Sequence, residues 1–153
     1  MVTEDYVNFE VAKLLKEKGF DGPCYKVWES HGDSQTLVGA SWFAEGETVV
    51  NRESVDAAAK QYAYEYNLNN NVEGYLAPTL QMVMKWLREV HNLHCCIDYD
   101  FVLEWYCQIT SLKETVEYDD LEMKHYHPDK VNSFSSPEEA CEVAIKYCLE
   151  NLI

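Results

Sequence analysis

The sequence predicts an α+β fold: a single domain, residues 1–153, whose antiparallel sheet of about four or five strands carries three or four helices mainly on one face. Three observations support this prediction. Capped stretches with apolar residues at helical spacing alternate with short extended runs. Several of the extended runs follow one another directly, which favours antiparallel pairing. No repeat, linker or low-complexity segment divides the chain.

One helix and a β-hairpin are predicted in the first 43 residues. Asn8 can cap a helix over residues 8–18, and Gly19 suits the left-handed position that follows many helix ends. Two extended runs, 24–30 and 36–43, flank a polar turn. This pattern is typical of a β-hairpin.

The segment 44–75 has the least decisive pattern and is a candidate insertion. A helix is predicted from Ser54 to about residue 66, because the run Asp56–Lys60 contains three alanines and favours helix over strand. The alternating tyrosines that follow would equally suit a strand. Asn67–Gly74 is expected to be a loop.

The clearest pattern in the chain covers residues 76–99. Thr79 is the predicted N-cap of a helix that Asn92 ends in the left-handed conformation. One apolar stripe runs along this helix, formed by Leu80, Val83, Trp86, Leu87 and Val90. A strand over 94–99 follows, and then the strongest strand pattern, 103–112, in which apolar and polar residues alternate.

The C-terminal part is predicted to contain two weaker strands, 115–118 and 121–126, and a final helix. Ser136 is its predicted N-cap, Pro137 suits the first helical position, and Glu139 can complete a capping box. The helix is expected to end near residue 151.

The charge is strongly acidic, with 12 basic and 27 acidic residues and a net charge of −15. Such a field repels nucleic-acid phosphates and anionic lipids, so neither nucleic acid nor membrane is an expected partner. The charge either keeps a cytoplasmic protein dispersed or forms a surface that imitates DNA. No apolar run is long enough for a membrane span, and the first residues lack the basic character of a signal peptide, so a cytoplasmic location is expected.

The cysteine and histidine residues do not form a convincing pattern for metal binding or catalysis. The six cysteines occur in apolar stretches, which favours reduced and mostly buried thiols. His91, His94, Cys95 and Cys96 lie within six residues, but adjacent cysteines on a strand point to opposite faces and His91 suits a helix end. We therefore predict no catalytic residue, metal or cofactor, and keep a small enzyme or metal-binding protein as a less favoured alternative.

Three stretches of the chain carry a family resemblance: Phe9–Asp21, Ala77–His94 and Ser136–Ile153. Together they resemble a group of small, acidic, uncharacterised proteins from gut Bacteroidales genomes and their phages and prophages. The resemblance implies a cytoplasmic accessory protein of a mobile element that is not an enzyme. It supplies no catalytic or binding residues.

The function expected from the sequence is binding to another protein, which the sequence does not identify. Aromatic anchors surrounded by charged residues are typical of such interfaces. The candidate anchors lie in and after the predicted helix at 54–66, which cannot bury all of them: Tyr62, Tyr64, Tyr66 and Tyr75. The alternative is an acidic DNA mimic that inhibits a nuclease or another DNA-binding protein. The oligomeric state stays open.

Overall fold

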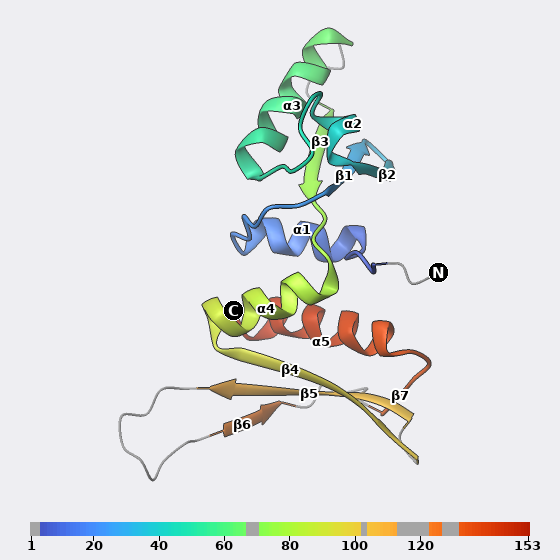
Figure 1. The fold of residues 1–153 in the computed structure, drawn as a ribbon, viewed down its shortest axis with the longest axis vertical. Helices are drawn as coiled ribbons and strands as arrows, with labels where there is room; N and C mark the ends of the chain where they lie inside the picture. Colours follow the sequence, from blue (N-terminus) through green and yellow to red (C-terminus); the bar gives the residue numbers. More distant parts are fainter. Residues whose placement is uncertain (1–3, 67–70, 102–103, 113–122, 127–131) are drawn as a thin grey trace. The chain divides into compact units, whose positions relative to one another are not determined.

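The computed structural model describes residues 4–66, 71–101, 104–112, 123–126 and 132–153, and it confirms the predicted α+β class (Figure 1). The described strands form two antiparallel sheets where one was expected. The chain divides into two compact units: Tyr6–Thr79, called the N-terminal unit below, and Leu80–Ile153 with the first residues of the chain, called the C-terminal unit. The prediction that they constitute a single domain stays a prediction.

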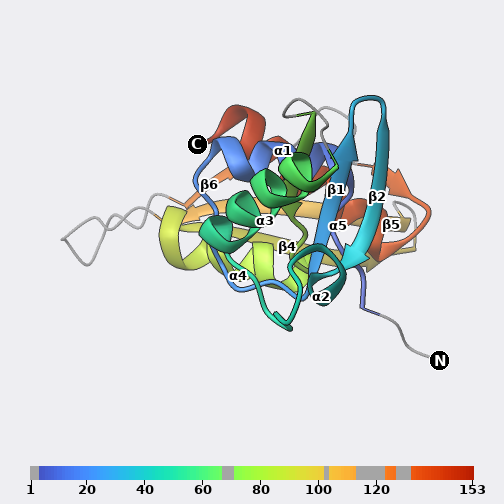
Figure 2. The ribbon, with the colours of Figure 1, turned by 90° about the horizontal axis from the view of Figure 1, so that it is seen from above.

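The N-terminal unit contains a three-stranded sheet with the strand order β2-β1-β3. In chain order its elements are α1 (Phe9–Glu17), β1 (Lys26–His31), β2 (Ser34–Gly39), α2 (Ala40–Phe43), α3 (Arg52–Glu65) and β3 (Val72–Leu76). The predicted helix after Asn8 and the predicted hairpin are confirmed. The hairpin and its tight turn are visible in Figure 2.

Helices cover both faces of this sheet, whereas the sequence predicted helices mainly on one face. On one side, the Phe9 ring of α1 lies 6.1 Å from the Trp28 ring and 5.3 Å from the Tyr75 ring. On the other side, Gly74 lies directly against Val55 of α3 and Phe43 of α2. Both faces of the strands carry large apolar side chains, so both must be covered.

Two predictions for the N-terminal unit were wrong. The strand predicted over 36–43 ends at Gly39, and Ala40–Phe43 form one helical turn in which Ala44 N–H donates to the Ala40 carbonyl at 2.8 Å. The predicted loop 67–74 includes the start of β3, which pairs with β1. Pairing with a neighbouring strand outweighed weak local preferences here. Residues 67–70 lie outside the described part of the chain.

The helix predicted from Ser54 is present but begins at Arg52. Its N-cap is Asn51, whose side-chain oxygen accepts from Ser54 N–H at 3.0 Å. In return the Ser54 hydroxyl oxygen accepts from Asn51 N–H at 2.9 Å. This reciprocal pair is a capping box built with Ser in place of the usual Glu or Gln.

The C-terminal unit contains one antiparallel sheet, in the order β4-β5-β6 with β7 also paired to β5. In chain order its elements are α4 (Leu80–His91), β4 (Leu93–Asp100), β5 (Glu104–Leu112), β6 (Met123–Tyr126), β7 (Asn132–Phe134) and α5 (Pro137–Asn151). Within this unit α4 and α5 pack on one face of the sheet, as the sequence predicted (Figure 1). The predicted strand 115–118 lies outside the described residues, and β7 was not predicted.

The core of the C-terminal unit uses only part of the predicted stripe on α4. Leu80, Val83 and Leu87 are buried, but Trp86 is only half-buried and Val90 is 58% exposed. The helix ends where expected, with Asn92 at a φ of 56°. α5 lies beside α4 on the same face of the sheet, and its largest fully buried side chains are Ile145 and Leu149.

The start of α5 differs slightly from the predicted capping box. The Ser136 hydroxyl oxygen accepts from Glu139 N–H at 3.1 Å, as expected for the N-cap. The Glu139 carboxylate, however, accepts from Ser135, at 3.0 Å from its N–H and 2.6 Å from its hydroxyl. These hydrogen bonds lower the pKa of Glu139. None of the described helices combines the length and apolar character that a membrane crossing requires.

Candidate interaction site

A hollow of about 510 Å³ lies between α2 and α3 in the N-terminal unit. Four aromatic residues line it: Trp42, Tyr62 and Tyr66, and the largely buried Phe43. Ala57 and Ala58 of α3 also line it, and their small side chains leave the space open. We call this hollow the aromatic groove.

The local fold explains why Trp42 lies at the groove with most of its surface in solvent. The single helical turn of α2 buries Phe43 against the sheet, and Gly74 gives that ring room. The preceding residue, Trp42, is consequently turned outward and is 77% exposed. Tryptophan is enriched at protein interfaces, because its large apolar ring also carries an N–H donor.

The opposite wall of the groove is set by the orientation of α3. Val55, Ala59 and Ala63 repeat every four residues and are buried. The intervening positions Ala58, Tyr62 and Tyr66 recur at the same spacing and line the groove. One face of α3 therefore builds the core, and the neighbouring face presents aromatic rings.

Tyr62 is held in place from two sides. Its ring centroid lies 4.6 Å from that of Tyr66 and 5.3 Å from that of His31. His31 is itself fixed by Glu29, whose carboxylate oxygen lies 2.6 Å from the His31 Nε2 atom and whose residue is 8% exposed. A ring positioned before binding loses less conformational entropy when a partner arrives.

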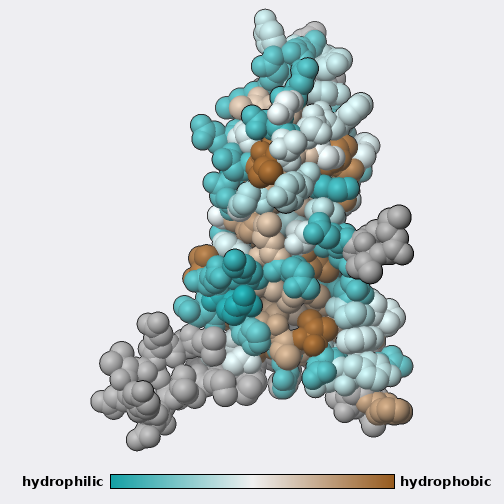
Figure 3. All heavy atoms as spheres, viewed as in Figure 1, coloured by the Kyte–Doolittle hydropathy of each residue, from teal (hydrophilic) through white to brown (hydrophobic). Residues whose placement is uncertain are grey.

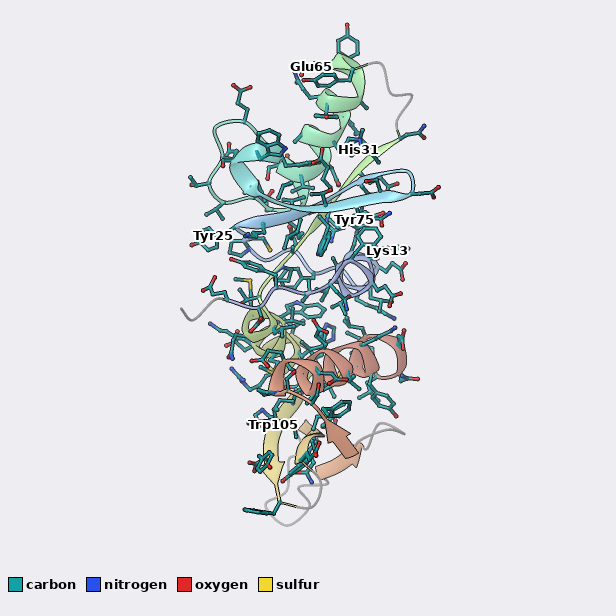
Figure 4. The ribbon with its side chains drawn as sticks, turned by 90° about the vertical axis from the view of Figure 1, so that its right-hand side faces the viewer. Lys13, Tyr25, His31, Glu65, Tyr75 and Trp105 are labelled. Carbon is teal, nitrogen blue, oxygen red and sulfur yellow. The ribbon has the colours of Figure 1, made fainter. Side chains whose placement is uncertain are left out.

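Two of the four predicted tyrosines come together in the groove. Tyr64 is not among the lining residues and is 88% exposed, because it lies on a different face of α3. Tyr75 lies across the sheet against Phe9 of α1. In Figure 4 the labelled Tyr75 is next to Lys13 and apart from Glu65 at the end of α3.

Tyr75 has partners of its own. The Lys16 Nζ atom lies 4.7 Å from the centre of its ring, and its hydroxyl donates a hydrogen bond to the Glu73 carboxylate. Burial, followed by this hydrogen bond, raises the pKa of Tyr75 to about 12. These contacts are those of a packed residue between α1 and the sheet.

Trp42 was missed at the sequence level because the run containing it was assigned to a strand. The surface hydropathy gives little help either, since the area over α2 and α3 at the top of Figure 3 is mainly pale or hydrophilic. Tyrosine and tryptophan have intermediate hydropathy, so an aromatic surface does not stand out on such a scale.

The charged residues of the groove all have the same sign. Glu45 and Glu65 are both among the lining residues and both exposed, and none of the lining residues is basic. The Glu65 carboxylate accepts a hydrogen bond from the Gln61 side-chain amide at 2.8 Å. Aromatic faces beside carboxylates attract cations, both through the ring quadrupole and through charge.

The His/Cys cluster lies elsewhere, on α4 and β4 of the C-terminal unit. His91 packs edge-on against Trp86 with the ring centroids 4.5 Å apart, and burial lowers its pKa. Cys95 is buried and Cys96 exposed, so the adjacent cysteines do point to opposite faces. In the described part of the chain, no three His, Cys, Asp or Glu side chains are placed to hold one metal ion.

All six cysteines are free thiols, and five of them are buried as predicted. The Sγ atoms of Cys95 and Cys148 lie 3.8 Å apart, and Cys141 Sγ lies 3.4 Å from Met84 Sδ. The pKa of Cys95 is raised, first by its hydrogen bond with Cys148 and then by burial. Such thiols pack as small apolar side chains.

Comparison with protein-family models, with curated proteins and with solved structures found no match to this chain.

Proposed function

We propose that this chain is a protein-interaction module that binds a cationic segment of a partner protein, bearing Arg or Lys, in the aromatic groove. The observation that carries the proposal is the exposed Trp42 ring, which lines the same hollow as the Tyr62–Tyr66 pair and the carboxylates of Glu45 and Glu65. The module has no catalytic role in this proposal.

The groove supplies the two kinds of contact that a guanidinium or ammonium group prefers. A cation over an aromatic face is stabilised by about 0.5–1 kcal/mol at an exposed site and by about 2 kcal/mol when water is excluded. Trp and Tyr are also enriched among the residues that dominate binding energies at protein interfaces. Glu45 and Glu65 add charge-assisted hydrogen bonds near the rings.

The overall charge supports the same partner chemistry. A net charge of −15 attracts a basic segment over the distance of a Debye length and speeds association. The proposal places the protein in the cytoplasm as an accessory protein of phage or prophage type, following the sequence resemblance. Free, buried thiols are in keeping with that compartment.

The proposal is tested by titrating the protein with a fluorescent peptide of alternating Arg and Ser residues in low-salt buffer. Replacing Trp42→Ala should weaken binding about tenfold, which corresponds to about 1.4 kcal/mol. Glu65→Gln should weaken it severalfold, because one charged hydrogen-bond acceptor is lost. A peptide in which Glu replaces Arg should not bind.

Two matched variants separate the groove from general attraction to an acidic protein. Tyr64→Ala removes an exposed ring from the same helix, and Glu53→Gln removes an exposed carboxylate from the start of that helix; neither residue lines the groove. Both variants should bind the peptide like the parent protein. If they weaken binding as much as Trp42→Ala and Glu65→Gln do, or if the parent protein binds no peptide, the proposal is wrong.

A further inference from the structure

Within the described residues of the C-terminal unit, no strand pairs with the outer edge of β4. Among the described residues, β4 pairs with β5 alone, through eight consecutive residue pairs from Leu93–Ser111 to Asp100–Glu104. The other edge of β5 is covered by β6 and β7. Apart from the Tyr99 N–H, which donates to the Asp98 carboxylate at 2.8 Å, the backbone groups along the outer edge of β4 can therefore receive another strand.

Apart from the acidic residues Asp98 and Asp100, this edge lacks the features that usually prevent pairing with another chain. Natural edge strands are protected by charged side chains, above all Lys, and by Pro, bulges or short length. β4 has eight residues, LHCCIDYD, with neither Lys nor Pro, and its register with β5 is uninterrupted. Its Ile and Tyr residues favour extended structure.

The sequence of β4 is complementary to itself about Cys96. In an antiparallel pair of two β4 strands centred on this residue, Cys96 lies opposite Cys96 of the second copy. His94 then lies opposite Asp98 of the other strand, and this pairing occurs twice. All three residues are exposed on the face of the sheet opposite α4 and α5. Direct neighbours in an antiparallel pair have Cβ atoms about 4.5–5.5 Å apart, which allows a hydrogen bond or ion pair between His and Asp.

We propose that β4 binds β4 of a second copy of this chain, antiparallel and centred on Cys96, so that the two sheets become one. In this register Cys95 lies opposite Ile97 of the second copy, and both point to the side covered by helices. The inference is independent of the proposed function, because the aromatic groove lies in the N-terminal unit.

Dimer formation is measured by analytical ultracentrifugation over a wide range of protein concentration. The mass should rise from the 17.8 kDa of one chain toward twice that value as concentration increases. Added NaCl should strengthen the dimer, since it screens the repulsion between two chains of charge −15. A mass that stays at one chain throughout the range overturns the proposal.

A charge exchange tests the pairing of His94 with Asp98. His94→Asp places two carboxylates opposite each other at both positions and should weaken the dimer at least tenfold. The double variant His94→Asp with Asp98→His restores opposite partners and should return the dissociation constant to within about threefold of the parent value. Gln108→Glu is the matched control, because it adds a negative charge to the same face of the sheet but on β5, away from the edge.

The register is tested at Cys96 with a short bismaleimide, which adds one thiol to each of its two double bonds. Cys96 is the one exposed cysteine, so crosslinking should give a covalent dimer that Cys96→Ser abolishes. Failure of the parent dimer to crosslink overturns the register centred on Cys96. If Gln108→Glu weakens the dimer as much as His94→Asp does, or if the charge exchange restores nothing, the pairing through β4 is wrong.

Discussion

Gly74 sets how closely α2 and α3 approach the sheet of the N-terminal unit. A Cβ atom added at this position would lie 2.4 Å from Val55 Cγ1 and 2.7 Å from Phe43 Cε1. Both distances are shorter than any unstrained carbon contact. The position of Phe43, and with it the outward orientation of Trp42, therefore depends on the absence of a side chain at residue 74.

Gly74→Ala should destabilise the protein by about 1–3 kcal/mol, the range typical of overpacking in a close-packed core. The measurement is urea unfolding followed by circular dichroism. Gly39→Ala is the control, because a Cβ atom there meets no heavy atom within 4 Å. Equal losses of stability in the two variants would show that close packing at Gly74 is not the cause.

The cysteines differ sharply in their expected reactivity. Burial raises the pKa of Cys24 and Cys141 to about 12 and that of Cys107 to about 11, while Cys96 is exposed. We expect Ellman's reagent at pH 8 to modify one thiol per folded chain quickly and all six after unfolding in guanidinium chloride. Dilute protein is used so that pairing through β4 does not cover Cys96. Rapid modification of a second thiol, or of any thiol in Cys96→Ser, would contradict this prediction.

The same raised pKa values predict that the free energy of unfolding falls at alkaline pH. A thiol whose pKa is higher in the folded state than its ordinary value of 9.0 favours the folded state while it is protonated. This contribution is complete below pH 9 and is lost as the pH rises toward 11 and 12. Chemical denaturation at pH 8 and pH 10.5 should accordingly show lower stability at the higher pH.

Among the elements, α3 matters most for the groove, because Tyr62 and Tyr66 lie at its C-terminal end. The stability of this helix depends in turn on its N-terminal cap at Asn51. Asn51→Ala removes the acceptor for Ser54 N–H and should cost about 1 kcal/mol, within the range measured for N-caps. Asn51→Asp keeps an acceptor and adds a charge favourable to the helix dipole, so it should retain the parent stability. Hydrogen exchange of the α3 amides measures the effect locally. If the α3 amides also exchange faster in Asn51→Asp, which keeps the acceptor, then loss of the cap hydrogen bond is not what destabilises Asn51→Ala.

Elements whose ends have local signals could be predicted from the sequence. The caps at Asn8 and Ser136, and the left-handed residue Asn92, all occur where the pattern placed them. These features depend on residues within one helical turn, so a single sequence contains the information.

Elements defined by distant partners could not be predicted in the same way. β3 is ordered by its pairing with β1, some forty residues earlier in the chain, and local composition suggested a loop there. The groove could not be predicted for a related reason. Trp42 becomes a lining residue only because the chain forms a helical turn from Ala40 and α3 packs next to that turn. The sequence indicated two of the groove's tyrosines, but not the tryptophan opposite them.

At the scale of the whole molecule, the dominant property is an excess of 15 negative charges over the positive ones. Repulsion among these charges opposes the compact state, and salt screens it. Raising NaCl from about 20 mM to about 300 mM should therefore raise the melting temperature by a few degrees, measured at a protein concentration where the chain is monomeric. A lower melting temperature in salt would mean that attractive ion pairs outweigh the excess charge.

Salt also separates the two binding proposals, because net charge attracts the cationic peptide to the protein but makes two copies of the protein repel each other. A cationic peptide in the aromatic groove is attracted by Glu45, Glu65 and the overall field, so the same increase in NaCl should weaken its binding. Two copies joined through β4 repel each other by net charge and are held by backbone hydrogen bonds and by two His94–Asp98 contacts. Salt screens the long-range repulsion more than these short contacts, so NaCl should strengthen the dimer. Measured on one preparation, the two dissociation constants should move in opposite directions. Parallel changes would show that one of the two contacts is not formed by the residues assigned to it.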